Sequence, residues 1–187
     1  MNLVPIKQIE QQDIQSINRI RTRIVKNRTA LINDIRGLCL EYGVVISPGA
    51  ARVKSSLCAA IAESDNELTP SSRESMQDLY EELVDVECRL KKLDTKIRQL
   101  CRQNENCQRI LKIPGVGELT ATAIVAAVPD PGEFRNGRHM SAWLGLVPRQ
   151  SSSGDKQILL GISKRGDRYL RTLLIHGARA VLLSLIH

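Results

Sequence analysis

The sequence predicts an all-α fold in which long coiled-coil helices precede a small helical domain. Apolar side chains recur at alternating spacings of three and four residues over residues 12–42 and again over residues 72–108. The texture changes near residues 105–110, after which glycine and proline become frequent and the expected elements become short. We therefore expect a coiled-coil and oligomerisation region over residues 1–108 and a helical domain over residues 109–187.

The first long helix is expected to end at Gly43, because glycine often terminates a helix in the left-handed conformation. Its seam contains two arginines among apolar and aromatic residues: Ile14, Ile17, Arg21, Ile24, Arg28, Leu31, Ile35, Leu38 and Tyr42. A short helix is expected next, with Ser47 as its cap and Pro48 in its first turn.

The second long helix is expected to run from Ser72 to about Gln108, with Ser71 and Glu74 as a capping box. Its seam is apolar throughout: Met76, Leu79, Leu83, Val86, Leu90, Leu93, Ile97 and Leu100. At 1.5 Å per residue this helix is about 55 Å long, which exceeds what a small globule needs. We therefore expect it to pair with the first helix, with another chain, or with both.

The charges of the two long helices bear on how they pair. The first helix is basic in its front half, whereas the second is acidic at its front and basic behind. Antiparallel pairing would tend to place basic residues against basic residues. Parallel contact between chains, or a nucleic acid over the basic end, removes this conflict, so we expect a homo-oligomer through the coiled coil.

The net charge of +7 is concentrated towards the end of the chain, since residues 135–187 contain nine Lys or Arg and two Asp or Glu. Concentrated positive charge is typical of a protein that binds a polyanion. The five cysteines lack CxxC spacing and indicate reduced thiols in a cytoplasm rather than a zinc site. We find no secretory signal and no stretch that approaches the apolar length needed to span a bilayer, so no membrane partner is expected.

Residues 109–128, RILKIPGVGELTATAIVAAV, match a helix-hairpin-helix pattern. Gly115, Val116 and Gly117 would form the tight turn, where glycines let the backbone approach a phosphate and the next helix directs its N–H groups at the anion. Such a contact reads no bases. A purely structural turn is the alternative, and Glu118 would repel phosphate, but we favour the DNA-binding interpretation.

Residues 161–183 follow with a dense group of cations at the entrance of a helix. These are Lys164, Arg165, Arg168 and Arg171. A solvated helix end is the bland interpretation, whereas the adjoining Ser/Gly loop favours a phosphate clamp.

The Ser/Gly loop lies between these motifs, in a region with room for a short β-hairpin near residues 146–162. A serine hydroxyl becomes a nucleophile only with a base or metal-bound partner and with cations that stabilise the developing charge. Arg149, Lys156 and Lys164 would supply that charge, but the only nearby bases, His139 and His176, lie in flanking segments. From the residues alone, a polar loop is the better interpretation.

Nearly the whole chain resembles the IS-one-ten family of insertion-sequence transposases, which are related to the Piv DNA invertase. The resemblance is carried by residues 11–46, by the IPGVG turn and by the SSSG and GISKRGDRYLR motifs. It implies DNA strand exchange through a covalent serine–DNA intermediate, in an oligomer guided by a structured RNA, in the bacterial cytoplasm and at the nucleoid. The family's Ser-Gly step falls on Ser153, with Ser151 and Ser152 as register alternatives.

The family's RuvC-like domain, which carries a DEDD carboxylate set, has no counterpart in these residues. We therefore expect no metal site and no cofactor in this chain, and Mg²⁺ only when a RuvC-like domain is present. The leading hypothesis is a transposase or site-specific recombinase segment that is incomplete without that domain. The alternatives are a non-catalytic DNA-binding and oligomerisation module and a truncated regulator of a full-length transposase.

Overall fold

The structure, a computed structural model, describes residues 7–153 and 156–186 and contains two compact units. Residues Arg19–Lys96 form one unit, called the rod unit here. Residues 7–18 and 97–186 belong to the other, called the carboxyl-terminal unit. The described part is helical apart from one two-stranded sheet, which confirms the predicted all-α class with a short β-hairpin.

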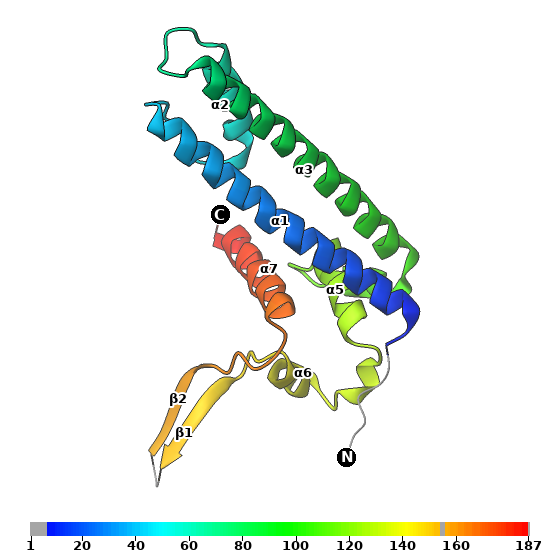
Figure 1. Cartoon of the computed structure of the whole chain (residues 1–187). Helices are drawn as coiled ribbons and strands as arrows, with labels where there is room; N and C mark the ends of the chain where they lie inside the picture. Colours follow the sequence, from blue (N-terminus) through cyan, green and yellow to red (C-terminus); the bar gives the residue numbers. More distant parts are fainter. Residues whose placement is uncertain (1–6, 154–155, 187) are drawn as a thin grey trace. The chain divides into compact units, whose positions relative to one another are not determined.

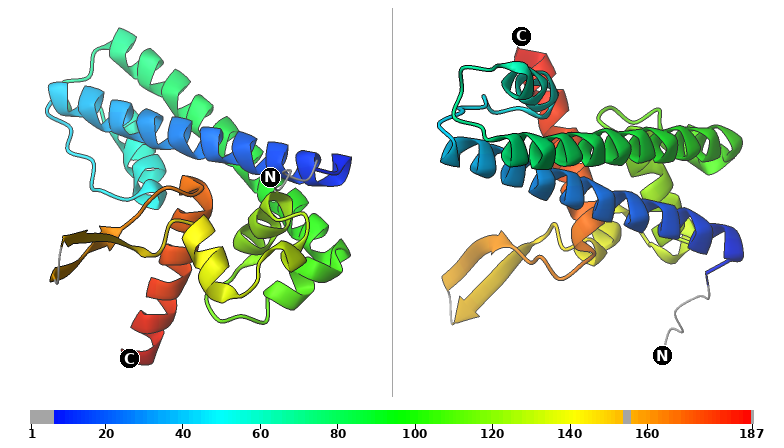
Figure 2. Two further views of the ribbon diagram at one scale, coloured as in Figure 1. Left: turned by 90° about the horizontal axis from the view of Figure 1, so that it is seen from below. Right: turned by 45° about the horizontal axis from the view of Figure 1, so that its top comes forward.

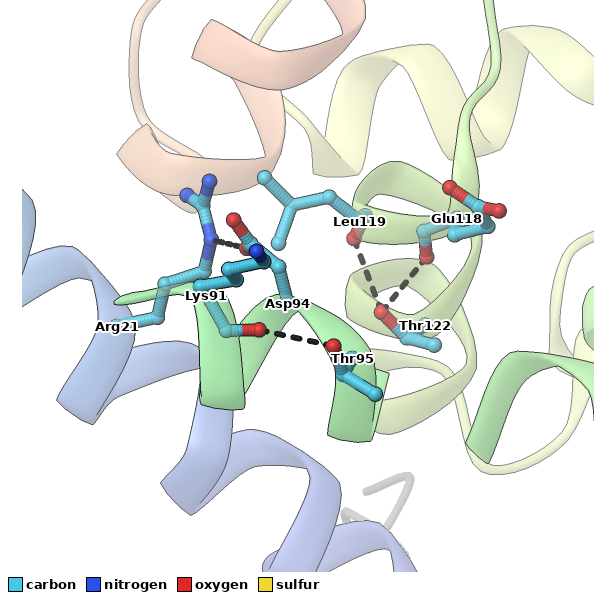
Figure 3. Close-up of polar contacts among 7 residues, drawn as sticks. All are labelled: Arg21, Lys91, Asp94, Thr95, Glu118, Leu119 and Thr122. Atoms are coloured by element: carbon cyan, nitrogen blue, oxygen red, sulfur yellow. Dashed lines mark hydrogen bonds and ion pairs between the residues drawn. The ribbon is translucent and has the colours of Figure 1, made fainter. Parts of the chain in front are cut away.

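Two long helices, α1 (Ile9–Glu41) and α3 (Pro70–Gln103), lie side by side along the rod unit (Figures 1 and 2). They run antiparallel, since Arg21 Nε is 2.5 Å from Asp94 Oδ1 and Arg28 Nη2 is 2.7 Å from Glu87 Oε1. Figure 3 shows the first of these ion pairs. The chain leaves α1 through Gly43, whose φ of 72° is left-handed as predicted.

The core of the rod unit lies between α1, α3 and the shorter helix α2 (Ala50–Ala62). Its buried members are apolar or sulfur-containing: Leu31, Ile35, Cys39, Ile46, Val53, Leu57, Met76 and Leu83. The seam residues Leu90 and Ile97 are also buried, so the three- and four-residue spacing of α3 identified its inner face correctly. Each fully buried aliphatic side chain of this kind contributes about 1.5–3 kcal/mol of transfer free energy.

The pairing of α1 with α3 corrects the charge argument from the sequence, which disfavoured antiparallel pairing in one chain. The two basic stretches do lie together, but the seam arginines Arg21 and Arg28 face carboxylates on α3. The carboxylate of Glu87 also forms an ion pair with Lys54 of α2, with Glu87 Oε2 2.6 Å from Lys54 Nζ. Antiparallel pairing is therefore explained by the charges on the facing sides of α1 and α3, and not by the total charge of each helix. Homo-oligomerisation stays a prediction.

Helix ends differ from the sequence prediction by a few residues. Helix α2 begins at Ala50 with Gly49 as its N-cap, two residues later than predicted. At the start of α3 the hydroxyl of Thr69 accepts a hydrogen bond from the N–H of Ser72, at 3.1 Å, in place of the expected cap at Ser71. The predicted rod ends early because Asn104 interrupts it and caps the following helix, accepting from Cys107 N at 3.0 Å.

The carboxyl-terminal unit consists of short elements followed by one longer helix. In chain order these are α4 (Glu105–Ile110), α5 (Glu118–Ala127), η1 (Pro131–Glu133), α6 (Gly137–Trp143), β1 (Pro148–Ser153), β2 (Lys156–Ile162) and α7 (Arg168–Ile186). Helix α5 is buried almost throughout, and its residues Ile124 and Val128 pack with Leu144 and Leu170. The first turns of α1 join this unit through Gln11 Nε2, which donates to Val125 O at 3.1 Å.

Strands β1 and β2 form an antiparallel hairpin that extends away from the helices of its unit (Figures 1 and 2). Ser153 pairs with Lys156 at the tip and Pro148 pairs with Ile162 at the base. The register shifts between Pro148 and Gln150, which leaves Arg149 in a bulge.

Helix α7 has the length and composition of a membrane span, so the expectation that no stretch approaches that apolar length is wrong. Its 19 residues, Arg168–Ile186, are long and apolar enough to cross a bilayer by length and composition. A single helix of this kind is weak evidence, because core helices of soluble proteins meet the same criterion. The predicted lack of a membrane partner stays a prediction.

Candidate nucleic-acid interface

The predicted order of helix, tight turn and helix is present over residues 105–127. The connection contains a turn in which Val116 N donates to Ile113 O at 3.1 Å. Pro114 presets the first central position, and Gly115 occupies the second with φ of 81°, which is the pattern of a type II turn. The sequence therefore builds this turn from local preferences.

Helix α5 begins with exposed backbone directly after this turn. Gly117 is its N-cap and has no side chain that could accept hydrogen bonds from the first N–H groups of the helix. These N–H groups are therefore available to donate hydrogen bonds to an anion. Glu118 lies 3.8 Å from Arg98, and both side chains are about half exposed, so the carboxylate is only weakly neutralised. Deeper in the helix the Thr122 hydroxyl donates to Glu118 O at 2.8 Å (Figure 3).

The two glycines of the turn serve different purposes. A Cβ at Gly115 would lie 2.6 Å from Gly177 O and 2.9 Å from Val181 Cγ2, both on α7. A Cβ at Gly117 would meet nothing within 4 Å. Glycine is thus required at Gly115 by its positive φ and by the close approach of α7, a packing role that the sequence interpretation did not include. The backbone of Gly117 remains open to a ligand.

The base of the β-hairpin is formed by two chain segments in backbone contact. Ser163 N donates to Val147 O at 2.8 Å and Lys164 N donates to Gly145 O at 3.0 Å. A Cβ at Gly145 would lie 2.7 Å from Arg165 N, so this crossing requires glycine. Lys164 itself has φ of 57°, an uncommon value for a residue with a side chain. The crossing of these two segments therefore fixes the backbone positions of Lys164 and Arg165, two of the predicted DNA-binding residues.

Four of the predicted DNA-binding cations are exposed around this base. They are Arg149 in β1, Lys164 and Arg165 in the turn after β2, and Arg168 at the start of α7. No ion pair neutralises any of these four within residues 7–153 and 156–186. They form an unpaired positive surface, which is the electrostatic requirement for holding phosphate.

The fourth predicted cation of the helix entrance, Arg171, has a different environment. Its side chain is only 8% exposed, and its Nη1 donates to Leu144 O and to Gly166 O, each at 3.1 Å. These carbonyls belong to the two segments that cross at the hairpin base. Arg171 therefore ties the hairpin to α7 and is not one of the exposed cations of this surface.

Arg135 and Arg138 are two of several exposed cations of this unit that were not predicted as site residues. Arg135 and Arg138 flank the start of α6, whose N-cap Asn136 accepts from His139 N at 3.0 Å. Beside them, the Phe134 ring contacts the Trp143 ring edge to face, with centroids 5.5 Å apart. The sequence analysis did not single out these arginines because they lie far from the serine motif. They do belong to the basic carboxyl-terminal third, and that charge excess was a signal that could have identified them.

The predicted nucleophile lies at the tip of the hairpin. The backbone of Ser153 ends β1, whereas the side chains of Ser152, Ser153 and Lys156 lie outside the described part of the structure. The two histidines considered as bases are both exposed, His139 on α6 and His176 on α7. The nucleophilic role of Ser153 and the identity of its base stay predictions.

Metal-binding side chains do not gather in the residues that the structure describes. Over residues 7–153 and 156–186, no three His, Cys, Asp or Glu side chains come together as candidate ligands. The described donors therefore do not fit the Mg²⁺ site that the family resemblance associates with a carboxylate domain.

Comparison with known proteins identifies the family. Residues 107–185 match the sequence profile of the IS116/IS110/IS902 transposase family. The chain is 48% identical to the transposase for insertion sequence element IS1111A of Coxiella burnetii over 97% of its own length and 50% of that protein.

More distant similarities agree with this match. The transposase for insertion sequence element IS1328 of Yersinia enterocolitica is 31% identical over 96% of this chain and 53% of that protein. The pilin gene-inverting protein of Moraxella bovis is 33% identical over 44% of this chain and 27% of that protein. The chain spans about half the length of the transposases it matches, and it belongs to the IS116/IS110/IS902 family of transposases.

Proposed function

We propose that this chain is the part of a transposase that holds DNA by its phosphates and presents Ser153 as the nucleophile for strand exchange. The observation that supports this most directly is the unpaired positive surface at the base of the serine-bearing hairpin, with Arg149, Lys164, Arg165 and Arg168 exposed. Because these cations lie at the base of the hairpin and Ser153 at its tip, we assign them to holding the DNA backbone and not to contact with the scissile phosphate.

The proposed reaction at Ser153 is a transesterification. The serine Oγ attacks a backbone phosphorus, an Oγ–P bond forms, and one P–O bond of the DNA strand breaks. The serine proton passes to a general base, and the departing DNA oxygen takes up a proton. Attack by a DNA hydroxyl on the phosphoserine ester then forms the new strand junction and releases the serine, so no external energy source is required.

A second contact with DNA is proposed at the turn before α5. The backbone N–H groups after Val116 and Gly117 open α5 and lie in exposed chain. They would hold a phosphate oxygen through the helix N-terminus, without reading the base sequence. Because Glu118 lies beside them, we assign this contact a smaller share of the binding than the cations of the hairpin base.

Completion of the reaction is proposed to need more than this chain. By resemblance, a RuvC-like DEDD domain with Mg²⁺ supplies the remaining catalytic groups, and a structured guide RNA and a homo-oligomer through the coiled coil assemble the complex. The bacterial cytoplasm, at the nucleoid, is the proposed location. Light scattering of the purified chain tests the oligomer, and a single-chain mass at micromolar concentration would contradict it.

A covalent adduct tests the nucleophile. The chain is mixed with the part of a full-length relative that it does not cover and with duplex DNA of an element end, and a protein–DNA species that resists denaturation is measured on a gel. We expect the adduct to form, to disappear in Ser153→Ala, and to persist in Ser151→Ala and Ser152→Ala, which serve as matched controls.

Mass spectrometry of the digested adduct then identifies the modified residue. An adduct that persists in Ser153→Ala and disappears in a neighbouring variant would assign the nucleophile to that neighbour and refute our choice. DNA binding that is unchanged in all three variants, with no adduct in the parent chain, would favour a non-catalytic binding module.

A further inference from the structure

The rod unit carries a second concentration of positive charge. In the antiparallel register set by the ion pairs Arg21–Asp94 and Arg28–Glu87, residues 19–28 of α1 lie beside residues 86–96 of α3. Together these two stretches contain nine Lys or Arg and two Asp or Glu. The remaining parts, residues 29–41 and 70–85, contain two Lys or Arg and seven Asp or Glu. The rod unit is therefore strongly polarised along its length.

The positive charge of this end is exposed and unpaired. Its carboxylates, Glu87 and Asp94, are already engaged by the seam arginines and by Lys54. Seven exposed cations remain: Arg19, Arg23, Lys26, Arg89, Lys91, Lys92 and Lys96. No ion pair neutralises any of the seven within the described residues of the chain. We call this set the basic end of the rod.

Helical spacing arranges six of these cations in two stripes. Arg19, Arg23 and Lys26 are separated by four and three residues, so they share one side of α1. Arg89, Lys92 and Lys96 are separated by three and four residues and share one side of α3. Each stripe is about 10 Å long at 1.5 Å per residue and lies on the side of its helix away from the buried seam.

Such a surface is electrostatically unfavourable in the free protein. Its like charges lie within or near the screening length of about 8 Å at physiological ionic strength, so they repel one another. A polyanion removes this repulsion and gains free energy by releasing its condensed counterions. We propose that the basic end of the rod binds the phosphodiester backbone of a nucleic-acid duplex, as a surface additional to the cations of the hairpin base.

The composition of the basic end indicates which form of nucleic acid it suits. Residues 19–28 and 86–96 contain no Phe, Tyr or Trp, so unpaired bases have no aromatic ring on which to stack. The stripes lie on the surface of two packed helices and follow a backbone without reading base edges. Binding at this end is therefore independent of base sequence and strongly dependent on salt.

Salt titration of the full chain tests the proposal. One variant combines Arg19→Gln, Arg23→Gln and Lys26→Gln, and a second combines Arg89→Gln, Lys92→Gln and Lys96→Gln. Glutamine has a helix propensity close to that of Lys and Arg, so α1 and α3 should remain intact, which circular dichroism checks. Loss of three phosphate contacts lowers the slope of log K against log salt by about 2.7 for duplex DNA.

A matched control changes the net charge equally at the opposite end of the rod, through Asn33→Asp, Ser71→Asp and Ser75→Glu. We expect its slope to equal that of the parent chain. If the stripe variants keep the slope of this control for both duplex DNA and duplex RNA, the proposal is wrong. A reduced slope for either duplex supports it, and comparison of the two assigns the partner.

The test separates this inference from the proposed function. Substituting Lys164, Arg165 and Arg168 with glutamine removes cations only from the hairpin base. If those substitutions lower the slope and the stripe variants do not, the basic end is refuted while the hairpin surface stands. The opposite result refutes the hairpin surface as the main DNA contact and supports the basic end.

Discussion

Replacing Gly177 with alanine tests whether α7 packs closely on the turn at Gly115. Close packing predicts a loss of stability, whereas free space around Gly177 predicts a gain. Alanine in a helix interior is favoured over glycine by about 0.8–1 kcal/mol where space permits. At Gly177, however, a Cβ would overlap Gly115 O and lie 3.1 Å from Gly115 C. Overpacking of this kind costs about 1–3 kcal/mol, so we expect a net loss of stability of up to about 2 kcal/mol.

Urea unfolding followed by circular dichroism measures this change, with Gly37→Ala as the matched control. Gly37 lies inside α1 and has nothing within 4 Å of its Cβ position, so this substitution should stabilise the chain by up to about 1 kcal/mol. For a domain of 150–250 residues, 1 kcal/mol corresponds to about 2–4 °C in Tm. Equal stabilisation by both substitutions would refute the packing of α7 on the turn at Gly115.

Three further predictions concern groups whose environment the structure defines. Burial, and then the neighbouring Cys101 thiol, raise the pKa of Cys107 to about 12. At pH 8 this thiol should therefore react with a disulfide reagent at least about 100-fold more slowly than the exposed Cys58. Equal reaction rates of the two cysteines would contradict the burial of Cys107. Partial burial acts to raise the pKa of Glu87, but its basic partners lower it on balance below the ordinary 4.5. Its stabilisation is therefore present above pH 4.5 and lost as the pH falls through the lowered pKa, so Glu87→Gln should cost on the order of 1 kcal/mol at pH 7 and nothing near pH 2, as measured by urea unfolding. Arg171→Leu should cost about 2–4 kcal/mol because the buried carbonyl of Leu144 and the partly buried carbonyl of Gly166 lose their donor, and an unchanged unfolding midpoint would refute its structural role.

The sequence predicted the long helices well because their burial follows from periodicity alone. Met76, Leu83, Leu90 and Ile97 recur every seven residues and are all buried. Helix ends were less predictable, since neighbouring residues compete for the same capping role. At the end of α3, a single asparagine that caps α4 divides what periodicity treated as one rod.

Features that depend on contacts between distant residues could not be read from the chain. Closeness in sequence grouped Arg171 with other cations, but only folding shows that it is buried against Leu144 and Gly166. Likewise, the first 134 residues contain eighteen cations and eighteen anions, so their total charge is zero. Antiparallel pairing is what gathers the cations at one end and the anions at the other.

Direct measurement of DNA binding tests the account most simply. Fluorescence anisotropy of the full chain with a labelled duplex is recorded between 50 and 200 mM salt. With at least the four exposed cations of the hairpin base in contact, the slope of log K against log salt should be about −3.6 or steeper, which weakens binding by roughly 100-fold or more over this range. Affinity that stays within about twofold across this range would contradict a contact dominated by phosphates.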